Sequence, residues 1–253
     1  NLPKGTEHFM SDLHGEYDAF YHIINNCSGV IREKVAMLYG DELTVFEQQE
    51  LCTLIYYPRE KLSILMDENK VNDEWYRNVL NQLIQIAKLL SSKYTRSKVR
   101  KAMPVDFAYI IDELIHAQKD EDDNRSVYHR QIMETILSLH NGDEFLVALT
   151  DLIKRLAVDH LHILGDIYDR GPHADKILDL LMEHHSVDIQ WGNHDILWMG
   201  AFCGNPVCMA LVVRNNIKYK TMSILENGYG ISLRFLLQFA VNTYSDKNVD
   251  DAV

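Results

Sequence analysis

Three short stretches gather carboxylate, imidazole and guanidinium side chains: MSDLHGE (residues 10–16), LHILGDIYDRG (161–171) and QWGNHD (190–195). In the first, Asp12 and His14 stand two positions apart, and on an extended strand such residues point the same way, toward one cation. Asp166 adds a second carboxylate, and Asn193 adds a neutral oxygen. This mixed nitrogen and oxygen set suits Mn²⁺, Zn²⁺ or iron better than it suits metals that prefer sulfur.

The chemistry that these residues predict is hydrolysis of a phosphate monoester. If Asp166 bridges two cations roughly 3.5–4 Å apart, they lower the pKa of a shared water toward about 7 and supply hydroxide for attack. The Arg170 guanidinium could grip two phosphate oxygens. His194 could protonate the leaving alkoxide, and Asp169 could hold that imidazole in the required tautomer. Paired cations and a cationic clamp are the electrostatic help that this slow reaction needs.

The strands and helices that must position these residues indicate an α/β fold. We expect strands at 7–11, 159–164 and 187–191, and helices at 174–185 and 195–202. Alternation of strands and helices predicts a parallel sheet with crossover connections. Each of the three motifs follows a predicted strand, and ligands of such sheets bind beyond the carboxyl ends of the strands.

The intervening chain has the periodicity of helices rather than strands. Apolar residues recur at helical spacing, most clearly at 79, 80, 83, 84, 87 and 90. The predicted helices are 44–57, 72–93, 106–117, 126–140 and 144–156, with an exposed loop at 119–124. We therefore expect a core formed by residues 1–30 and 157–253, interrupted by an all-helical insertion over 31–156.

Composition narrows the possible partners. The 253 residues are 47% hydrophobic and carry a net charge of −12, which argues against a protein that binds the nucleic-acid backbone. No apolar run approaches the roughly 20 residues that cross a bilayer, and the first residues lack a signal-peptide pattern. The four cysteines form no C-x-x-C pair and are expected to be reduced. We expect a cytoplasmic protein without nucleic-acid or membrane partners.

The motifs D-x-H-G (12–15), G-D-x-x-D-R-G (165–171) and G-N-H-D (192–195) resemble those of the calcineurin-like metallophosphoesterase superfamily. Asp12 and Asp166 are 154 positions apart, much farther than in most of that superfamily. This helical interval, with SDLHGEYDAF and LGDIYDRGPHADKILDLL, resembles the class III fructose-1,6-bisphosphatases of Firmicutes. The resemblance implies hydrolysis of fructose 1,6-bisphosphate to fructose 6-phosphate in gluconeogenesis, with Mn²⁺ as the usual metal.

The same resemblance implies roles for seven positions. Asp12, His14 and Asp166 would bind one metal, while Asp166 and Asn193 would bind the other. Arg170 and Asn193 would contact the substrate phosphate, and His194 with Asp169 would form the acid dyad.

One part of the family pattern is missing. The superfamily supplies two further histidines downstream of G-N-H, whereas all twelve histidines here lie at or before His194. We therefore expect an N-terminal piece of a longer protein. It would form part of a metallophosphoesterase sandwich and hold an incomplete second metal site.

Two alternatives stay open from the sequence. The chain could be another calcineurin-like enzyme, such as a protein phosphatase or a dinucleotide polyphosphatase, although the large insertion disfavours that. It could also be a non-catalytic scaffold, which would have no need for Asp169, Arg170 and His194. Assembly into a homo-oligomer is left open, and the substrate expected is a small sugar bisphosphate.

Overall fold

The computed structural model describes residues 5–116 and 123–244. The chain divides into two compact units, one made of residues 1–8 and 22–160, the other of residues 9–21 and 161–253. The second unit is therefore built from two segments that are far apart in the sequence. Within the described part of the chain, no helix is both long enough and apolar enough to span a membrane.

The first unit is helical. Its helices are α2 (Val30–Tyr39), α3 (Val45–Tyr56), α4 (Pro58–Asp67), α5 (Asp73–Ser91), α6 (Arg96–Ala102), α7 (Ala108–Ile115), α8 (Asp123–Ser138) and α9 (Gly142–Ala157). Helix α1 (Tyr17–Asn26) begins in the second unit and ends in this one. Short 3₁₀ turns, η1 (Cys27–Gly29) and η2 (Val105–Phe107), precede α2 and α7.

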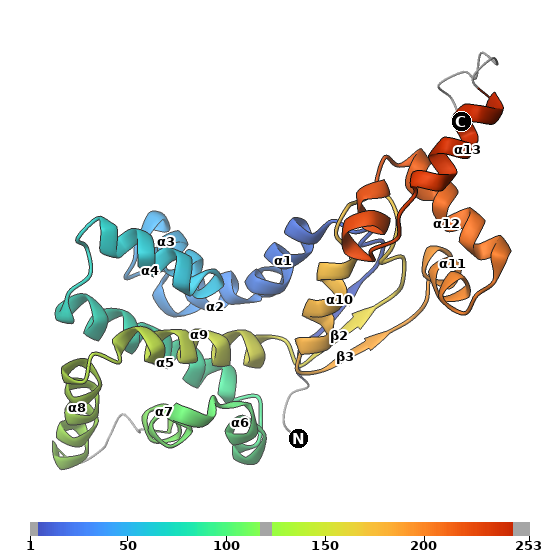
Figure 1. Ribbon diagram of the computed structural model, residues 1–253. Coiled ribbons are helices and arrows are strands. Elements are labelled where there is room, and N and C mark those ends of the chain that lie inside the picture. Colours follow the sequence, from blue (N-terminus) through green and yellow to red (C-terminus); the bar gives the residue numbers. More distant parts are fainter. Residues whose placement is uncertain (1–4, 117–122, 245–253) are drawn as a thin grey trace. The chain divides into compact units, whose positions relative to one another are not determined.

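Helices α5 and α9 form the centre of this unit and lie side by side (Figure 1). The predicted apolar positions of α5 are all buried, including Leu80 and Leu83 with no exposed surface. Leu149 and Leu152 of α9 are equally buried. The helical periodicity therefore predicted the buried face of α5 correctly, since it marks the apolar side chains that are buried away from solvent.

The helical unit differs from its prediction in two respects. Helices α2, α4 and α6 were not predicted, and α4 begins at Pro58, where the sequence suggested only an end. Proline suits the first turn of a helix because the N–H it lacks has no intrahelical partner there. Residues 117–122 of the predicted loop lie outside the described residues, while Asp123 and Asn124 belong to α8.

The second unit contains most of a three-stranded sheet in the order β1 (Glu7–Met10), β2 (His160–Ile163) and β3 (Val187–Ile189). Strands β2 and β3 run parallel, with Leu161 paired to Val187 and Ile163 to Ile189 (Figure 1). Helix α10 (Ala174–Glu183) connects them. The α/β class and the crossover between parallel strands are thus confirmed, although all three strands are shorter than predicted.

Helices complete this unit after β3. They are α11 (Asn193–Phe202), α12 (Pro206–Lys218), the π-helical turn η3 (Ile224–Gly228) and α13 (Arg234–Tyr244). Val212, Leu225 and Leu233 form a small buried cluster, against which Leu197 and Trp198 of α11 pack. This cluster fixes α12 against the helix that begins with the third sequence motif.

Candidate active site

The first two motifs are held together by backbone hydrogen bonds. The N–H of Asp12 donates to the carbonyl of Gly165 at 3.1 Å, and the N–H of His14 donates to the carbonyl of Asp166 at 2.8 Å. Gly15 continues the series by donating to Ile167 at 2.8 Å. Successive backbone hydrogen bonds therefore join the loop after β1 to the loop after β2, although more than 150 residues separate them in the chain.

Two glycines let these loops approach so closely. The N–H of Gly171 donates to the carbonyl of His14 at 2.6 Å. A Cβ atom on Gly171 would collide with the backbone of His14 and Gly15, and one on Gly15 would collide with the backbone of Gly171. Because backbone atoms cannot move aside as a flexible side chain can, both positions require glycine.

Asp195 joins the third motif to the second. Its carboxylate is 5% exposed and accepts hydrogen bonds from the backbone N–H groups of Asp166 (2.7 Å), Ile167 (2.9 Å), Tyr168 (3.3 Å) and Gly192 (2.9 Å). Buried N–H groups need acceptors, and a carboxylate offers several lone pairs at once. Asp195 therefore fixes the loop that carries Asp166 relative to the start of α11.

Left-handed backbone is concentrated at the site. Asp12, His14, Asp166, Asp169 and Arg170 have φ values of 55°, 45°, 56°, 66° and 76°. Such values are uncommon outside glycine and cost free energy, so the surrounding hydrogen bonds must impose them. The predicted reason for the convergence of Asp12 and His14 was therefore wrong: they lie beyond the end of β1, and not on an extended strand.

Asp12, His14 and Asp166 form a group whose potential ligand atoms all lie within 4.8 Å of one another. His14 Nδ1 lies 3.1 Å from the carbonyl oxygen of Tyr168, which can only accept, so Nδ1 donates there and Nε2 is left for another partner. Nε2 lies 3.5 Å from Asp12 Oδ1 and, within the described part of the chain, is buried without a hydrogen-bond partner. A metal-binding histidine is arranged in this way, so the group fits a divalent cation.

Asp169 and His194 form the second pair that the sequence predicted. Their contact, Asp169 Oδ2 to His194 Nδ1, is 2.7 Å long, and Asp169 is only 2% exposed. The rings of His14 and His194 meet edge to face with their centres 5.4 Å apart. The group of Asp12, His14 and Asp166, which we call the metal group, therefore lies next to the Asp169–His194 pair within the second unit.

Two further predicted residues are exposed. Arg170 directly follows Asp169, and its guanidinium makes no hydrogen bond or ion pair with any residue that the structure describes. Asn193 is the first residue of α11. The N–H of His194, the next residue, donates to Asp166 Oδ1 at 3.2 Å, which brings the start of α11 to the metal group.

A cavity of about 620 Å³ lies beside the Asp169–His194 pair and is lined almost entirely by apolar and aromatic side chains. Tyr168 and Trp198 belong to its wall and stack with their ring centres 4.5 Å apart. Burial, and then the hydrogen bond with the Tyr229 hydroxyl at 3.3 Å, raises the pKa of Tyr168 above its ordinary value. Tyr168 therefore stays neutral, and this wall offers no charge to a ligand.

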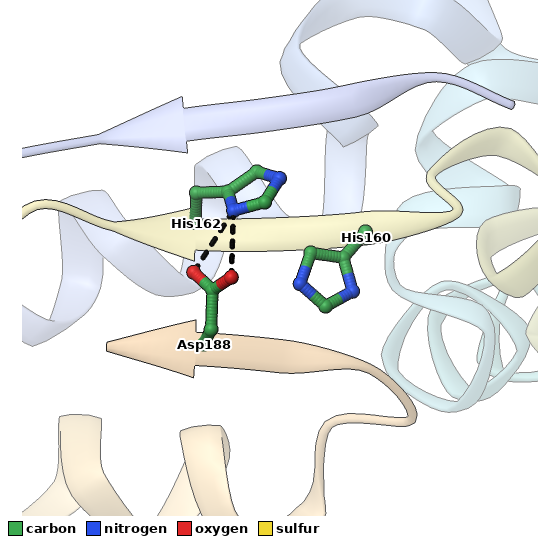
Figure 2. A group of neighbouring side chains, drawn as sticks. All are labelled: His160, His162 and Asp188. Carbon is green, nitrogen blue, oxygen red and sulfur yellow. Dashed lines mark hydrogen bonds and ion pairs between the residues drawn. The ribbon is translucent and has the colours of Figure 1, made fainter. Parts of the chain in front are cut away.

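A different pair of polar residues lies on the sheet itself. Figure 2 shows His162 of β2 facing Asp188 of β3, with His160 two positions earlier on β2. His162 Nδ1 lies 2.8 and 3.0 Å from the two carboxylate oxygens of Asp188. The strand register puts these two residues opposite each other, as a cross-strand pair. With His160 they form a second group whose potential ligand atoms all lie within 4.8 Å of one another.

Comparison with known proteins identifies the relatives of this chain. The model of a family described as Firmicute fructose-1,6-bisphosphatase matches residues 1–252. The chain belongs to this family. It is 55% identical over 246 residues to fructose-1,6-bisphosphatase class 3 1 of Clostridium beijerinckii, 54% identical to the class 3 protein of Listeria monocytogenes and 52% identical to that of Bacteroides fragilis. No solved structure matches the chain.

The matches cover 97% of this chain but only 37–38% of each of these three relatives. The family resemblance seen in the motifs is thus confirmed over nearly the whole chain. All seven site residues predicted from the sequence lie in the second unit of this fructose-1,6-bisphosphatase family member.

Sequence reasoning missed three residues that contact the predicted ones. Asp195 was quoted within its motif without a role, and neither Trp198 nor Asn215 was assigned one. The sequence did contain a signal for Asp195. An acidic residue three positions after the residue that precedes a helix commonly accepts hydrogen bonds from backbone N–H groups at the helix N-terminus, and Asp195 stands three positions after Gly192. Trp198 stands four positions after His194 on the same helix face, which is a weaker signal.

Proposed function

We propose that this chain carries the catalytic centre of a metal-dependent fructose-1,6-bisphosphatase, which hydrolyses fructose 1,6-bisphosphate to fructose 6-phosphate and phosphate. The observation that carries this proposal is the buried Nε2 of His14, which has no hydrogen-bond partner in the described part of the chain and belongs to a group with Asp12 and Asp166. Family membership supports the substrate, because the curated relatives are named class 3 fructose-1,6-bisphosphatases.

The metal proposed is Mn²⁺. Asp12, His14 and Asp166 would hold one ion, while Asp166 and Asn193 would contribute to a second. Oxygen and imidazole ligands suit this ion, and the four cysteines do not belong to the group. A divalent cation bound there supplies positive charge for the phosphoryl oxygens and lowers the pKa of a water molecule.

The side chains of the protein itself would do the remaining work. Arg170, which is exposed and unpaired within the described residues, would hold the phosphate, with Asn193 as a second contact. His194 would donate a proton from Nε2 to the leaving sugar oxygen, because its Nδ1 is engaged by Asp169. Loss of an alkoxide without a proton is unfavourable, so this transfer would act at bond cleavage.

The finer architecture also belongs to this proposal. We interpret residues 1–30 and 157–253 as part of a calcineurin-like metallophosphoesterase sandwich, with 31–156 as a helical insertion. The location of the predicted site residues in the second unit supports this division. The parallel pairing of β2 with β3 is compatible with half of such a sandwich.

Phosphate release by the purified protein tests the activity, both as the 253-residue chain and as the full product of its gene, with Mn²⁺ present. We expect fructose 1,6-bisphosphate to be preferred over other sugar phosphates, phosphopeptides and dinucleotide polyphosphates. Preference for a phosphopeptide or a dinucleotide would assign a different phosphatase. Absence of release from every ester by the full product would leave only the scaffold interpretation.

Binding of Mn²⁺ to the chain tests the site separately, by calorimetric titration or by the paramagnetic resonance of the free ion. Asp166→Ala should weaken binding at least tenfold, because it removes a shared ligand. Asp188→Ala is the comparison, since it removes the carboxylate of the other candidate group, on β2 and β3, and a larger loss there than in Asp166→Ala would place the ion on the sheet. Equal losses in the two variants would place the ion elsewhere.

A further inference from the structure

The carboxylate of Asp169 is bound by more partners than the acid dyad requires. Its Oδ2 accepts from Nδ2 of Asn215 at 2.9 Å as well as contacting His194, and its Oδ1 accepts from Nε1 of Trp198 at 3.0 Å. Both oxygens of this buried group are therefore engaged by donors from α11 and α12. No sequence motif assigns a role to Asn215 or Trp198.

We propose that Asn215 and Trp198 are positioning residues, which fix the carboxylate plane of Asp169 and thereby the tautomer and orientation of His194. This inference rests on the proposed function for the part that His194 plays in it. The indole N–H can only donate, and the amide N–H of Asn215 donates here, so Asp169 is held as an acceptor on both oxygens. With its plane fixed, Oδ2 presents a lone pair to Nδ1, and Nε2 is left for the leaving oxygen.

The helices explain how the two donors reach the same carboxylate. His194 and Trp198 are four positions apart on α11 and therefore share a face. Asn215 comes from α12, which packs against α11 through Val212 and Val213. The constraint on Asp169 thus depends on the packing of two helices, one of which lies beyond all three motifs.

Asn216, the next residue on α12, makes structural contacts that do not involve Asp169. It is 1% exposed, donates from Nδ2 to the carbonyl of Val212 and accepts from the Thr221 hydroxyl at 3.1 Å. These contacts lie within α12 and the turn after it. Asn216 is therefore a matched control: it is more deeply buried than Asn215 but does not contact Asp169.

The test compares Asn215→Leu and Trp198→Phe with Asn216→Leu in the full product of the gene, with Mn²⁺ present. Asn215→Leu removes a donor to Asp169 at nearly constant size, and Trp198→Phe removes the other donor together with part of the indole ring while keeping an aromatic side chain. For fructose 1,6-bisphosphate we expect kcat to fall roughly 10–100-fold, with KM changed less than about twofold. For 4-nitrophenyl phosphate, whose leaving group needs no proton, kcat should fall less than about threefold. Asn216→Leu should lower the melting temperature but preserve the ratio between the two esters.

A readout without catalysis makes the outcomes separable. In the ¹⁵N-histidine-labelled chain, the resonances of His194 should show Nδ1 protonated, and in Asn215→Leu and Trp198→Phe they should show a mixture of tautomers. Asn215→Gln should partly restore the original spectrum, since it returns a donor. Equal losses on both esters together with an unchanged tautomer would overturn the positioning role. Wild-type protein that releases no phosphate but shows the expected tautomers would refute the proposed function alone.

Discussion

At the residue scale, a few side chains hold the site together by accepting or donating several hydrogen bonds each. Asp195 accepts from four backbone N–H groups, and Asp169 accepts from three side chains. Both are buried, so each replaces contacts that water would otherwise provide. These two carboxyl groups therefore link the loop around Asp166 to helices α11 and α12.

Replacing Asp195 with Asn tests this dependence. An amide has one acceptor oxygen in place of two, and its NH₂ group would face N–H donors, so buried donors would lose their partners. We expect the free energy of unfolding of the second unit to fall by roughly 3 kcal/mol, measured by urea denaturation with near-ultraviolet circular dichroism. Asp179→Asn removes the same charge from an exposed position of α10 and should change it by less than about 0.5 kcal/mol. A similar loss in the two variants would contradict the role of Asp195.

At the element scale, the sequence predicted what local periodicity determines. The buried face of α5 and the crossover helix α10 follow from spacing alone, because each needs only one apolar stripe. The convergence of Asp12, His14 and Asp166 was predicted from their places after strands. The contacts of Asp169 with Asn215 and Trp198 were not predicted, since Asn215 is 46 positions away from Asp169 and lies on α12, which carries no motif. Such contacts depend on tertiary packing, which a single sequence does not display.

The contact between α5 and α9 supplies the element-scale prediction. Leu149 of α9 has no exposed surface and lies in the core cluster with Leu83 of α5. Leu149→Ala should lower the free energy of unfolding by about 2–5 kcal/mol, because it removes buried apolar atoms and leaves a cavity. Denaturation followed by far-ultraviolet circular dichroism measures the change. Leu139→Ala is the control, since Leu139 is 63% exposed, and a comparable effect there would mean that burial does not explain the loss.

At the scale of the whole molecule, the proposed site lies entirely in one of the two units. The first unit has its own apolar core, formed by residues from Cys27 to Val158. The second unit holds every residue that we assign to metal, phosphate or proton transfer. A ligand of the site should therefore stabilise the second unit directly, because a ligand that binds only the native state raises the free energy of unfolding of that unit.

Scanning calorimetry with and without Mn²⁺ tests this separation. At a free concentration one hundred times Kd, the ion should add about 2.7 kcal/mol to the stability of the second unit. We expect two transitions, of which Mn²⁺ raises only one and Leu149→Ala lowers only the other. Chelation with EDTA should reverse the first shift. A single transition that responds equally to both changes would show that the two units unfold together.

The indole of Trp198 also offers an optical probe of the site. It stacks on Tyr168 and donates to Asp169, whereas Trp75 is half-buried in the first unit and Trp191 is 66% exposed. The chain has no fourth tryptophan, so Trp75→Phe and Trp191→Phe together would leave one native tryptophan, beside Asp169 and His194. The arrival of an ion or a sugar phosphate could then be timed by stopped-flow emission from the unlabelled protein.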